Sequence, residues 1–223
     1  MKMLHFNSIK KELFDKFYKI YEENFNDPSE VETSEQLFKY INSKWGIPQP
    51  DTHLFLAMDE DSVMGAIVVE YYRASDCILL TYIVTDSKYR KQGVARKLIA
   101  EVSEYFKDKN LKAVFIEAND PAKTDASMES MNTEERLLFY KRVGAKIVDV
   151  PYSQPALGEG KEACECLLLL ALPLVGQNEI KKETILRFLY EFYSACGVEN
   201  PEEDKNFILS MNWMKDVVSL KEI

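Results

Sequence analysis

The chain has 223 residues, a formal net charge of −9 and an apolar content of 46%, which suits one large domain, or one domain with an appendage, built on a packed core. The acidic balance argues against broad nucleic-acid binding, because that requires a basic surface, and it favours cationic ligands. Since no apolar run reaches the roughly 20 residues that span a bilayer, we expect a cytoplasmic protein without a membrane partner.

The first third of the chain predicts a strand, two helices and two further strands. Residues 3–6 suit a short strand, and apolar residues spaced by three or four predict an amphipathic helix over 8–25 with Ser8 as its N-cap. A second helix is expected from about Ser34 to Trp45. Alternating and β-rich segments then predict strands over 53–58 and 63–72, with Gly65 at a bulge.

Residues 78–98 combine an apolar strand, a polar turn and the start of an amphipathic helix. The first turn of a helix carries unpaired N–H groups and partial positive charge, and Gly93 leaves room for an anion to approach the backbone. Lys88 and Lys91 add charge to the same loop, in a chain that is acidic overall. The segment predicts a site for a polyanion such as a pyrophosphate; the alternative is an ordinary strand–turn–helix with a solvated basic turn.

The rest of the chain alternates between β-rich and amphipathic segments. A long polar loop separates the next strand from the next helix, and Gly144 ends that helix. Two strands and two final helices follow. The expected elements are a strand over 112–118, a loop over 119–132, a helix from Thr133 to Gly144, strands over 145–150 and 163–172, and helices over 178–195 and 202–219.

The four cysteines show no metal-ligand spacing. Cys164 and Cys166 lie two apart in an expected strand and would point to the same face, and no CxxC pair exists. His5 and His53 are the only imidazoles, so we expect no metal site. Reduced, mostly buried thiols are the expected state of a cytosolic protein.

Residues 78–98 resemble the acyl-CoA loop of the GCN5-related N-acetyltransferases, in which Gln/Arg-x-x-Gly-x-Gly/Ala follows a strand. Arg90, Gly93 and Ala95 occupy the three fixed positions of that pattern. The resemblance implies that N–H groups of the loop bind the CoA pyrophosphate and that the preceding strand pairs with the pantetheine arm. The residues implied to bind acetyl-CoA are Ile83, Val84, Arg90, Lys91, Gln92, Gly93, Val94, Ala95 and Arg96.

The order of elements over residues 1–172 is similar to that family's fold, an α/β (α+β mixed) arrangement with a mixed, mostly antiparallel central sheet flanked by helices. Residues 173–223 lie outside the resemblance, and we expect them to form a C-terminal helical extension packed on the same domain.

The activity implied by the resemblance is transfer of an acetyl group from acetyl-CoA to a primary amine of a small molecule or protein. No nucleophilic serine or cysteine motif is present, which favours direct attack in a ternary complex. The alternative is an inactive acyl-CoA-binding module that acts through a protein partner. A nucleotide-binding protein is disfavoured, because the chain has no GxxxxGK[ST] motif.

Two residues are candidates for acid–base catalysis. Glu117 ends an apolar strand, where a carboxylate with a raised pKa would suit a general base; the alternative is an exposed or lysine-paired glutamate. Tyr140 lies four residues before Gly144, which resembles the position of the tyrosine that protonates the CoA thiolate in the family, although Ala145 replaces the usual aromatic residue. The alternative for Tyr140 is a core residue.

The acceptor site is expected near loops that this family uses for the purpose. Glu30 and Tyr152 are the leading candidates to attract a cation, with Glu70 and Asp120 as further ones; each could instead be an ordinary surface residue. The asparagine that often precedes the tyrosine helix in the family corresponds to either Asn119 or Asn132.

Overall fold

The computed structural model describes residues 1–25, 32–43, 48–124, 133–157 and 161–223. The strands are β1 (Lys2–Phe6), β2 (Asp51–Asp59), β3 (Ser62–Tyr72), β4 (Cys77–Thr85), β5 (Ala113–Asn119), β6 (Lys146–Val148), β7 (Leu167–Ala171), β8 (Glu179–Lys181) and β9 (Val217–Lys221). The helices are α1 (Lys11–Asn24), α2 (Ser34–Asn42), α3 (Val94–Tyr105), α4 (Thr133–Arg142), α5 (Lys182–Ala195) and α6 (Lys205–Trp213), with short 3₁₀ helices at Ser87–Tyr89 and Pro201–Glu203.

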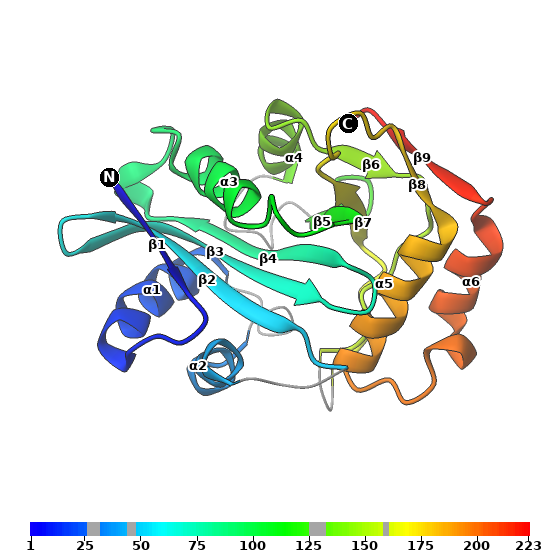
Figure 1. The fold of residues 1–223 in the computed structure, drawn as a ribbon, viewed down its shortest axis with the longest axis horizontal. Helices are drawn as coiled ribbons and strands as arrows, with labels where there is room; N and C mark the ends of the chain where they lie inside the picture. The colour runs from blue at the N-terminus through cyan, green and yellow to red at the C-terminus, as the bar shows by residue number, and fades with distance from the viewer. Residues whose placement is uncertain (26–31, 44–47, 125–132, 158–160) are drawn as a thin grey trace.

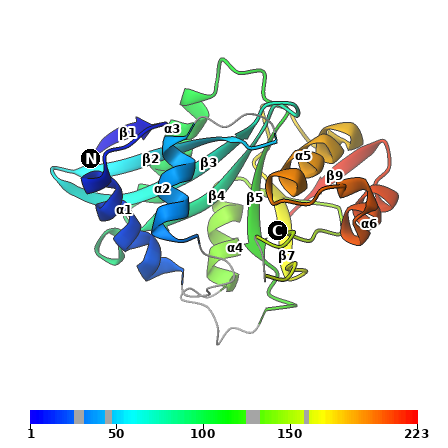
Figure 2. The same ribbon diagram turned by 90° about the horizontal axis from the view of Figure 1, so that it is seen from below.

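One sheet runs through the molecule, with helices on both faces (Figures 1 and 2). Its nine strands lie in the order β1-β2-β3-β4-β5-β7-β6-β9-β8. Among the strand pairs that the structure describes, only β4–β5 is parallel. The expected mixed, mostly antiparallel sheet is therefore confirmed.

Alternation along β3 shows how the two faces are covered. Ile67 and Val69 pack in the cluster beneath α3 and α4, whereas Val68 packs against α1 and α2 on the opposite face. Tyr72, on the same face as Val68, packs against α5. Glu70 lies between Val68 and Tyr72, so it falls at the junction between two apolar cores.

The central strands β4 and β5 are paired over only part of their length. Val68 pairs with Tyr82 and Val69 with Leu80, which leaves Thr81 as a bulge residue. Parallel pairing of β4 with β5 ends at Leu80 and Ile116, although β4 continues to Thr85 and β5 to Asn119. The backbone of β4 beyond Thr81 thus has no strand partner on its β5 side among the described residues.

The first helices differ slightly from the expected bounds. Lys10 takes the N-cap position of α1, and the Ser8 hydroxyl instead donates to Asn42 Oδ1 at 2.9 Å, so the prediction that Ser8 caps the helix is wrong. Thr33 and Gln36 form a capping box at α2. The predicted end of this helix at Trp45 lies outside the described residues.

Gly65 lies beside a bulge, as expected, but close packing explains the glycine. Ala57 pairs with Gly65 and Met58 with Val63, so Met64 is the extra residue. A Cβ atom on Gly65 would lie 2.7 Å from the Val84 carbonyl oxygen and 3.0 Å from Val94 Cγ1. The absence of a side chain therefore lets β3 approach both β4 and the start of α3.

The last fifty residues contain strands as well as helices. The predicted helix over 202–219 is wrong beyond the end of α6, because Val217–Lys221 forms the strand β9. In β9, Lys221 pairs with Ile147 of β6 and Val218 pairs with Ile180 of β8. Since β9 joins β6, residues 173–223 extend the central sheet in addition to covering it with α5. None of the helices in the described segments is long and apolar enough to cross a membrane.

Cys164 and Cys166 form a disulfide, with their Cα atoms 5.4 Å apart, so the prediction of reduced thiols is wrong for this pair. Both residues precede β7, which begins at Leu167 rather than at residue 163. The backbone of Cys164 instead bridges to Gln154. Cys77 and Cys196 are free.

His5 and His53 contact each other, with His5 Nε2 and His53 Nδ1 2.9 Å apart. Burial, reinforced by His5, lowers the pKa of His53 to about 4. Because this lies below the unfolded value of about 6.5, the contribution to stability is complete above pH 6.5 and is lost as the pH falls toward 4. The full difference between the folded and unfolded pKa of His53 corresponds to roughly 3 kcal/mol of free energy of unfolding.

We therefore expect His53→Gln to reduce the acid sensitivity of the fold. Urea denaturation at pH 7 and pH 4.5 should show that the wild-type protein loses more free energy of unfolding than the variant between these two values, by about 2–3 kcal/mol. Equal losses in the two proteins would contradict the assignment.

Candidate active site

The loop between β4 and α3 leaves backbone N–H groups outside the helical hydrogen-bond ladder. Gly93 is the N-cap of α3 in a left-handed conformation, with φ +78°, and has no side-chain cap. The first intrahelical bond runs from Lys97 N to Gly93 O at 3.1 Å. The N–H groups of Val94, Ala95 and Arg96 therefore precede the helical ladder and are oriented for an anion.

The rest of this loop carries positive charge on an exposed turn. Lys91 also has a positive φ, 62°, and such residues help to form concave clusters of N–H groups that bind anions. Arg90 Nη2 donates to Asn24 Oδ1 at 3.0 Å, and Gln92 Nε2 donates to the Lys88 carbonyl at 2.9 Å. These bonds brace the loop, and the structure thus brings the predicted residues 90–96 together around the helix start.

Ile83 and Val84 connect this loop to the point where β4 and β5 separate. They pair with Ile67 and Ala66 of β3. Val84 is buried beneath α1 and α2, whereas Ile83 is half-buried on the α3 face. Their remaining strand edge lies on the side where pairing with β5 has ended, which suits an extended ligand arm.

A cavity of about 230 Å³ lies at the junction between the two cores on the α1–α2 and α5 face of the sheet. Carboxylates and aromatic rings from distant parts of the chain share its wall. The lining includes Glu32, Glu70, Glu117, Arg136, Asn119, Gln154, Phe25, Tyr40, Tyr72, Tyr82, Phe192 and Cys196.

The acidic groups of this cavity are poorly hydrated. Burial raises the pKa of Glu32, with Lys161 opposing, and burial also raises the pKa of Glu70, which accepts a hydrogen bond from the Tyr72 hydroxyl at 2.7 Å. Three glutamates and one arginine line the cavity, so a bound cation would be favoured.

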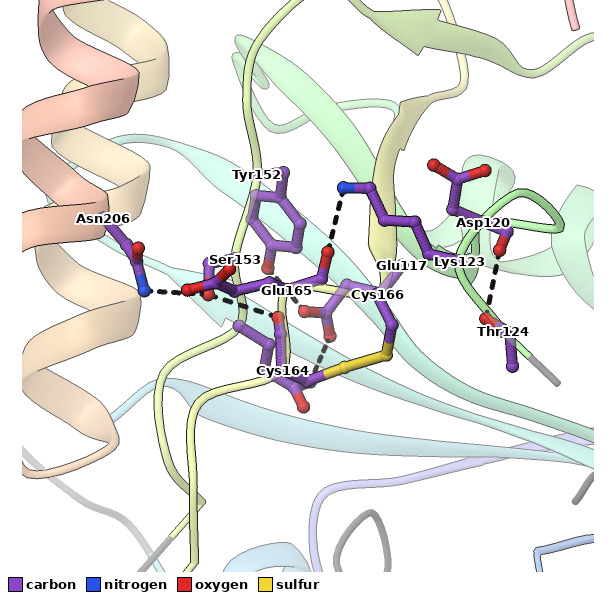
Figure 3. Close-up of a disulfide and its surroundings, with 11 residues drawn as sticks. Glu117, Asp120, Lys123, Thr124, Tyr152, Ser153, Cys164, Glu165, Cys166 and Asn206 are labelled. Carbon is purple, nitrogen blue, oxygen red and sulfur yellow. Dashed lines mark hydrogen bonds between the residues drawn. A yellow bond between two sulfur atoms is a disulfide. The ribbon is translucent and has the colours of Figure 1, made fainter.

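Glu117 faces this cavity at the point of strand separation. It is the first β5 residue beyond the last pair with β4, and its neighbours Ile116 and Ala118 point into the opposite core. The Tyr152 hydroxyl donates to one carboxylate oxygen of Glu117 (Figure 3). Gln154 Nε2 donates to the other oxygen at 2.9 Å. Both partners orient the carboxylate.

Tyr140 lies in the core on the other face of the sheet. Its ring contacts Phe139 and it belongs to the cluster beneath α3 and α4, with only 7% of its surface exposed. Burial raises the pKa of Tyr140, while Arg136 opposes the shift. The phenol is therefore protonated near neutral pH and has a proton to donate.

The predicted acceptor residues and the two candidate asparagines divide into three groups. Glu70 and Asn119 both line the cavity. Tyr152 is buried with its hydroxyl on Glu117, and Asp120 accepts a bond from the Ala122 N–H at 3.0 Å and is not among the cavity residues. Glu30 and Asn132 lie outside the described residues.

Several cavity residues were not predicted from the sequence. Glu32 lies just before α2, and Phe192 and Cys196 come from α5 and the residue after it. Glu32 gave no signal beyond proximity to a helix start. Phe192 formed part of a regular apolar stripe, which predicts burial but not a cavity wall.

Acetyltransferases are the class of protein to which this fold and this site point. The sequence profile described as the acetyltransferase (GNAT) family matches residues 14–125. The chain belongs to that family, and the resemblance inferred from residues 78–98 is confirmed. A comparison with curated protein sequences found no match.

Solved structures share the fold at low sequence identity. A GNAT-family protein from Bacteroides thetaiotaomicron is 19% identical, with a TM-score of 0.57 over 77% of this chain and 86% of its own. An aminoglycoside 6′-N-acetyltransferase complexed with coenzyme A is 18% identical, with a TM-score of 0.56 over 77% and 96%. The ribosomal-protein-S18-alanine N-acetyltransferase from Escherichia coli is 13% identical, with a TM-score of 0.50 over 79% and 98%.

Proposed function

We propose that this protein transfers an acetyl group from acetyl-CoA to a primary amine that carries positive charge in solution. The observation that carries the proposal is the acidic cavity at the separation of β4 and β5, with Glu117 on its wall. Family membership supports acetyl transfer. The fold relatives named above include two N-acetyltransferases, whose acceptors differ from each other, so the cavity rather than the fold is the guide to the acceptor.

The residues around the α3 start fit the phosphates of acetyl-CoA. The Cβ position of Gly93 has no atom within 4 Å, and three N–H groups precede the helical ladder beside it. Lys88, Lys91 and Arg96 are exposed on the same loop and supply opposite charge. When bound, acetyl-CoA would supply the activated acyl group and the thiolate leaving group.

Two residues are proposed for the proton transfers of this reaction, Glu117 at the strand separation and Tyr140 in the core beneath α3 and α4. An alkylamine has a pKa of about 10.4, so it must lose a proton to become a nucleophile near pH 7. Glu117 accepts that proton, a C–N bond forms and the C–S bond breaks. Tyr140 is the proposed donor of a proton to the departing thiolate. The amine attacks directly, within a ternary complex.

Turnover tests this function directly. The purified protein, supplied with acetyl-CoA and a panel of primary amines, should release free thiol in an amine-dependent manner. Binding of acetyl-CoA without thiol release from any amine would instead support the inactive module that acts through a protein partner.

A substitution of Gly93 tests the cofactor site. Gly93→Val should abolish measurable binding of acetyl-CoA, because a β-branched side chain disfavours the left-handed backbone that presents the N–H groups. Calorimetric titration of acetyl-CoA into the variant gives the affinity, with circular dichroism as a check on folding.

Gly176→Val is the matched control. Gly176 has φ +76°, is exposed and also has no atom within 4 Å of its Cβ position. Both variants should carry the same backbone strain, but only Gly93→Val should lose acetyl-CoA binding. Unchanged affinity in a folded Gly93→Val protein would remove the loop from the cofactor site.

A further inference from the structure

The C-terminal helix α5 is anchored directly to the central sheet. The buried carboxylate of Glu191 accepts hydrogen bonds from the backbone N–H groups of Ala74 and Ser75, each at 2.8 Å, in the turn between β3 and β4. Gln49, which lines the cavity, donates to the Ala195 carbonyl at 3.0 Å. These bonds fix α5 relative to the strands that carry Glu70 and Tyr72.

This helix also closes one side of the cavity. Phe192, Ala195 and Cys196 are lining residues. Phe192 is 4% exposed and its ring meets that of Tyr72 edge-on, with centroids 6.2 Å apart. The family profile ends at residue 125, so this wall comes from a part of the chain that the family match does not include.

Side chains of α5 and α6 also hold the segment 151–154. The Tyr193 hydroxyl donates to the Ser153 carbonyl at 2.9 Å. Asn206 Nδ2 donates to Ser153 Oγ at 3.1 Å (Figure 3). The Ser210 hydroxyl donates to the Pro151 carbonyl at 2.6 Å. All three donors belong to residues that are buried, which restricts the segment to one position.

The residues on either side of Ser153 both contact Glu117. Tyr152 and Gln154 each donate to one carboxylate oxygen, and Gln154 is further held by paired backbone bonds to Cys164, both 2.9 Å. Hydrogen bonds from α5 and α6 therefore hold Ser153, and its two neighbours in the chain hydrogen-bond Glu117.

We propose that residues 173–223 complete the acceptor site, with Phe192 selecting the size of the amine and with Tyr193 and Asn206 as positioning residues that orient Glu117 through segment 151–154. This inference rests on the proposed function, because it assigns to the same reaction a residue that selects the amine and residues that orient the base.

Several ionisable groups interact electrostatically with Glu117. They are Tyr72 of β3, Tyr152 of segment 151–154, and Tyr193 and Cys196 of α5 and the residue after it. The charged groups that share the cavity with it are Glu32, Glu70 and Arg136. Burial raises the pKa of Tyr193, so Tyr193→Phe removes a phenol that is neutral near pH 7, and Asn206→Ala removes no ionisable group. Their effect on Glu117 therefore acts through the positions of Tyr152 and Gln154.

The positioning arm uses Tyr193→Phe and Asn206→Ala. Each should lower kcat/KM for the amine about tenfold and move the acidic limb of its pH profile upward, because less well placed donors stabilise the carboxylate less. The KM for acetyl-CoA should not change. Tyr190 is an exposed residue of the same helix, so Tyr190→Phe is the matched control and should retain wild-type kinetics.

The size arm uses Phe192→Ala with a series of primary amines from ethanolamine through tyramine to kanamycin. The ratio of kcat/KM for large over small amines should rise about tenfold in this variant, since the cavity loses an aromatic wall. Tyr190→Ala should leave the ratio unchanged. In Phe192→Leu this ratio should lie between those of the wild type and Phe192→Ala. That result separates an effect of cavity volume from a general loss of packing.

The outcomes separate this inference from the function on which it rests. No thiol release by the wild-type protein with any amine would overturn both. Wild-type turnover with the same amine selectivity in Phe192→Ala, and with unchanged pH profiles in Tyr193→Phe and Asn206→Ala, would overturn the role of residues 173–223 and leave the proposed function standing. Equal losses in the Tyr190 controls would also overturn it.

Discussion

Replacing Tyr140 with phenylalanine should lower kcat by about 10²- to 10⁴-fold and leave the KM for acetyl-CoA nearly unchanged. A group that protonates the departing thiolate acts mainly in the transition state, so its loss appears in kcat rather than in binding. Burial keeps the phenol protonated over the working pH range, which is the state that donation requires. Single-turnover measurements, in which the chemical step is observed directly, provide the test.

The control for this experiment is Tyr105→Phe. Tyr105 lies on α3 and is 44% exposed, and it has no place in the proposed chemistry. The Tyr140→Phe protein should melt close to the wild-type temperature, because it retains the ring that packs beneath α3 and α4. A folded Tyr140→Phe variant with wild-type single-turnover rates would make Tyr140 a core residue only.

Glu117→Gln should lower kcat/KM for the amine by about 10²-fold or more and remove one ionisation from its pH profile. The carboxylate is the form that accepts a proton, so the wild-type rate should rise with pH through this ionisation and through that of the amine. The glutamine variant should retain only the rise that belongs to the amine. Both proteins must be measured with one acceptor, because deprotonation of the amine alone also gives a rising profile.

Glu70→Gln provides the comparison within the same cavity. Burial raises the pKa of Glu70, so this carboxyl is the competing candidate for the base. We expect Glu70→Gln to weaken binding of the amine while both ionisations remain. Identical profiles for wild type and Glu117→Gln, with the limb lost in Glu70→Gln, would transfer the role of the base to Glu70.

Local patterns were sufficient to predict the strand, turn and helix of residues 78–98. These elements are contiguous in sequence, Gly93 favours the left-handed backbone at the helix start, and the apolar spacing of α3 is helical. The alternation that predicts β2 and β3 is equally local. The strand–turn–helix that carries the proposed anion site could therefore be predicted before any tertiary contact was known.

The acceptor side depends on contacts between distant segments. Glu32, Glu70 and Glu117 share a cavity because three separate elements meet there, and no local pattern records such a meeting. Tyr152 was expected to contact an acceptor, but its buried hydroxyl binds Glu117. Sequence spacing could identify the loop that carries Tyr152 but not the direction of its side chain.

The C-terminal strand shows how two periodicities can compete. Met211, Met214 and Val218 fit a helical stripe, which led to the predicted helix over 202–219. In the structure the helical part ends at Trp213, and Val217 and Val218 alternate between exposed and buried positions in β9. β9 lies between β6 and β8, and the edge of β6 is specified by residues far earlier in the chain.

The pairing of β9 with β6 affects the order in which the molecule is assembled on the ribosome. The strands and helix that carry the anion loop are synthesised first, and their contacts are short-range in sequence. The segment 151–154 emerges later, but Tyr193, Asn206 and Ser210, which hold it, emerge later still. A nascent chain therefore completes the proposed anion loop before the cavity wall, and the carboxylate of Glu117, the proposed base, is held in place only when translation has passed α6.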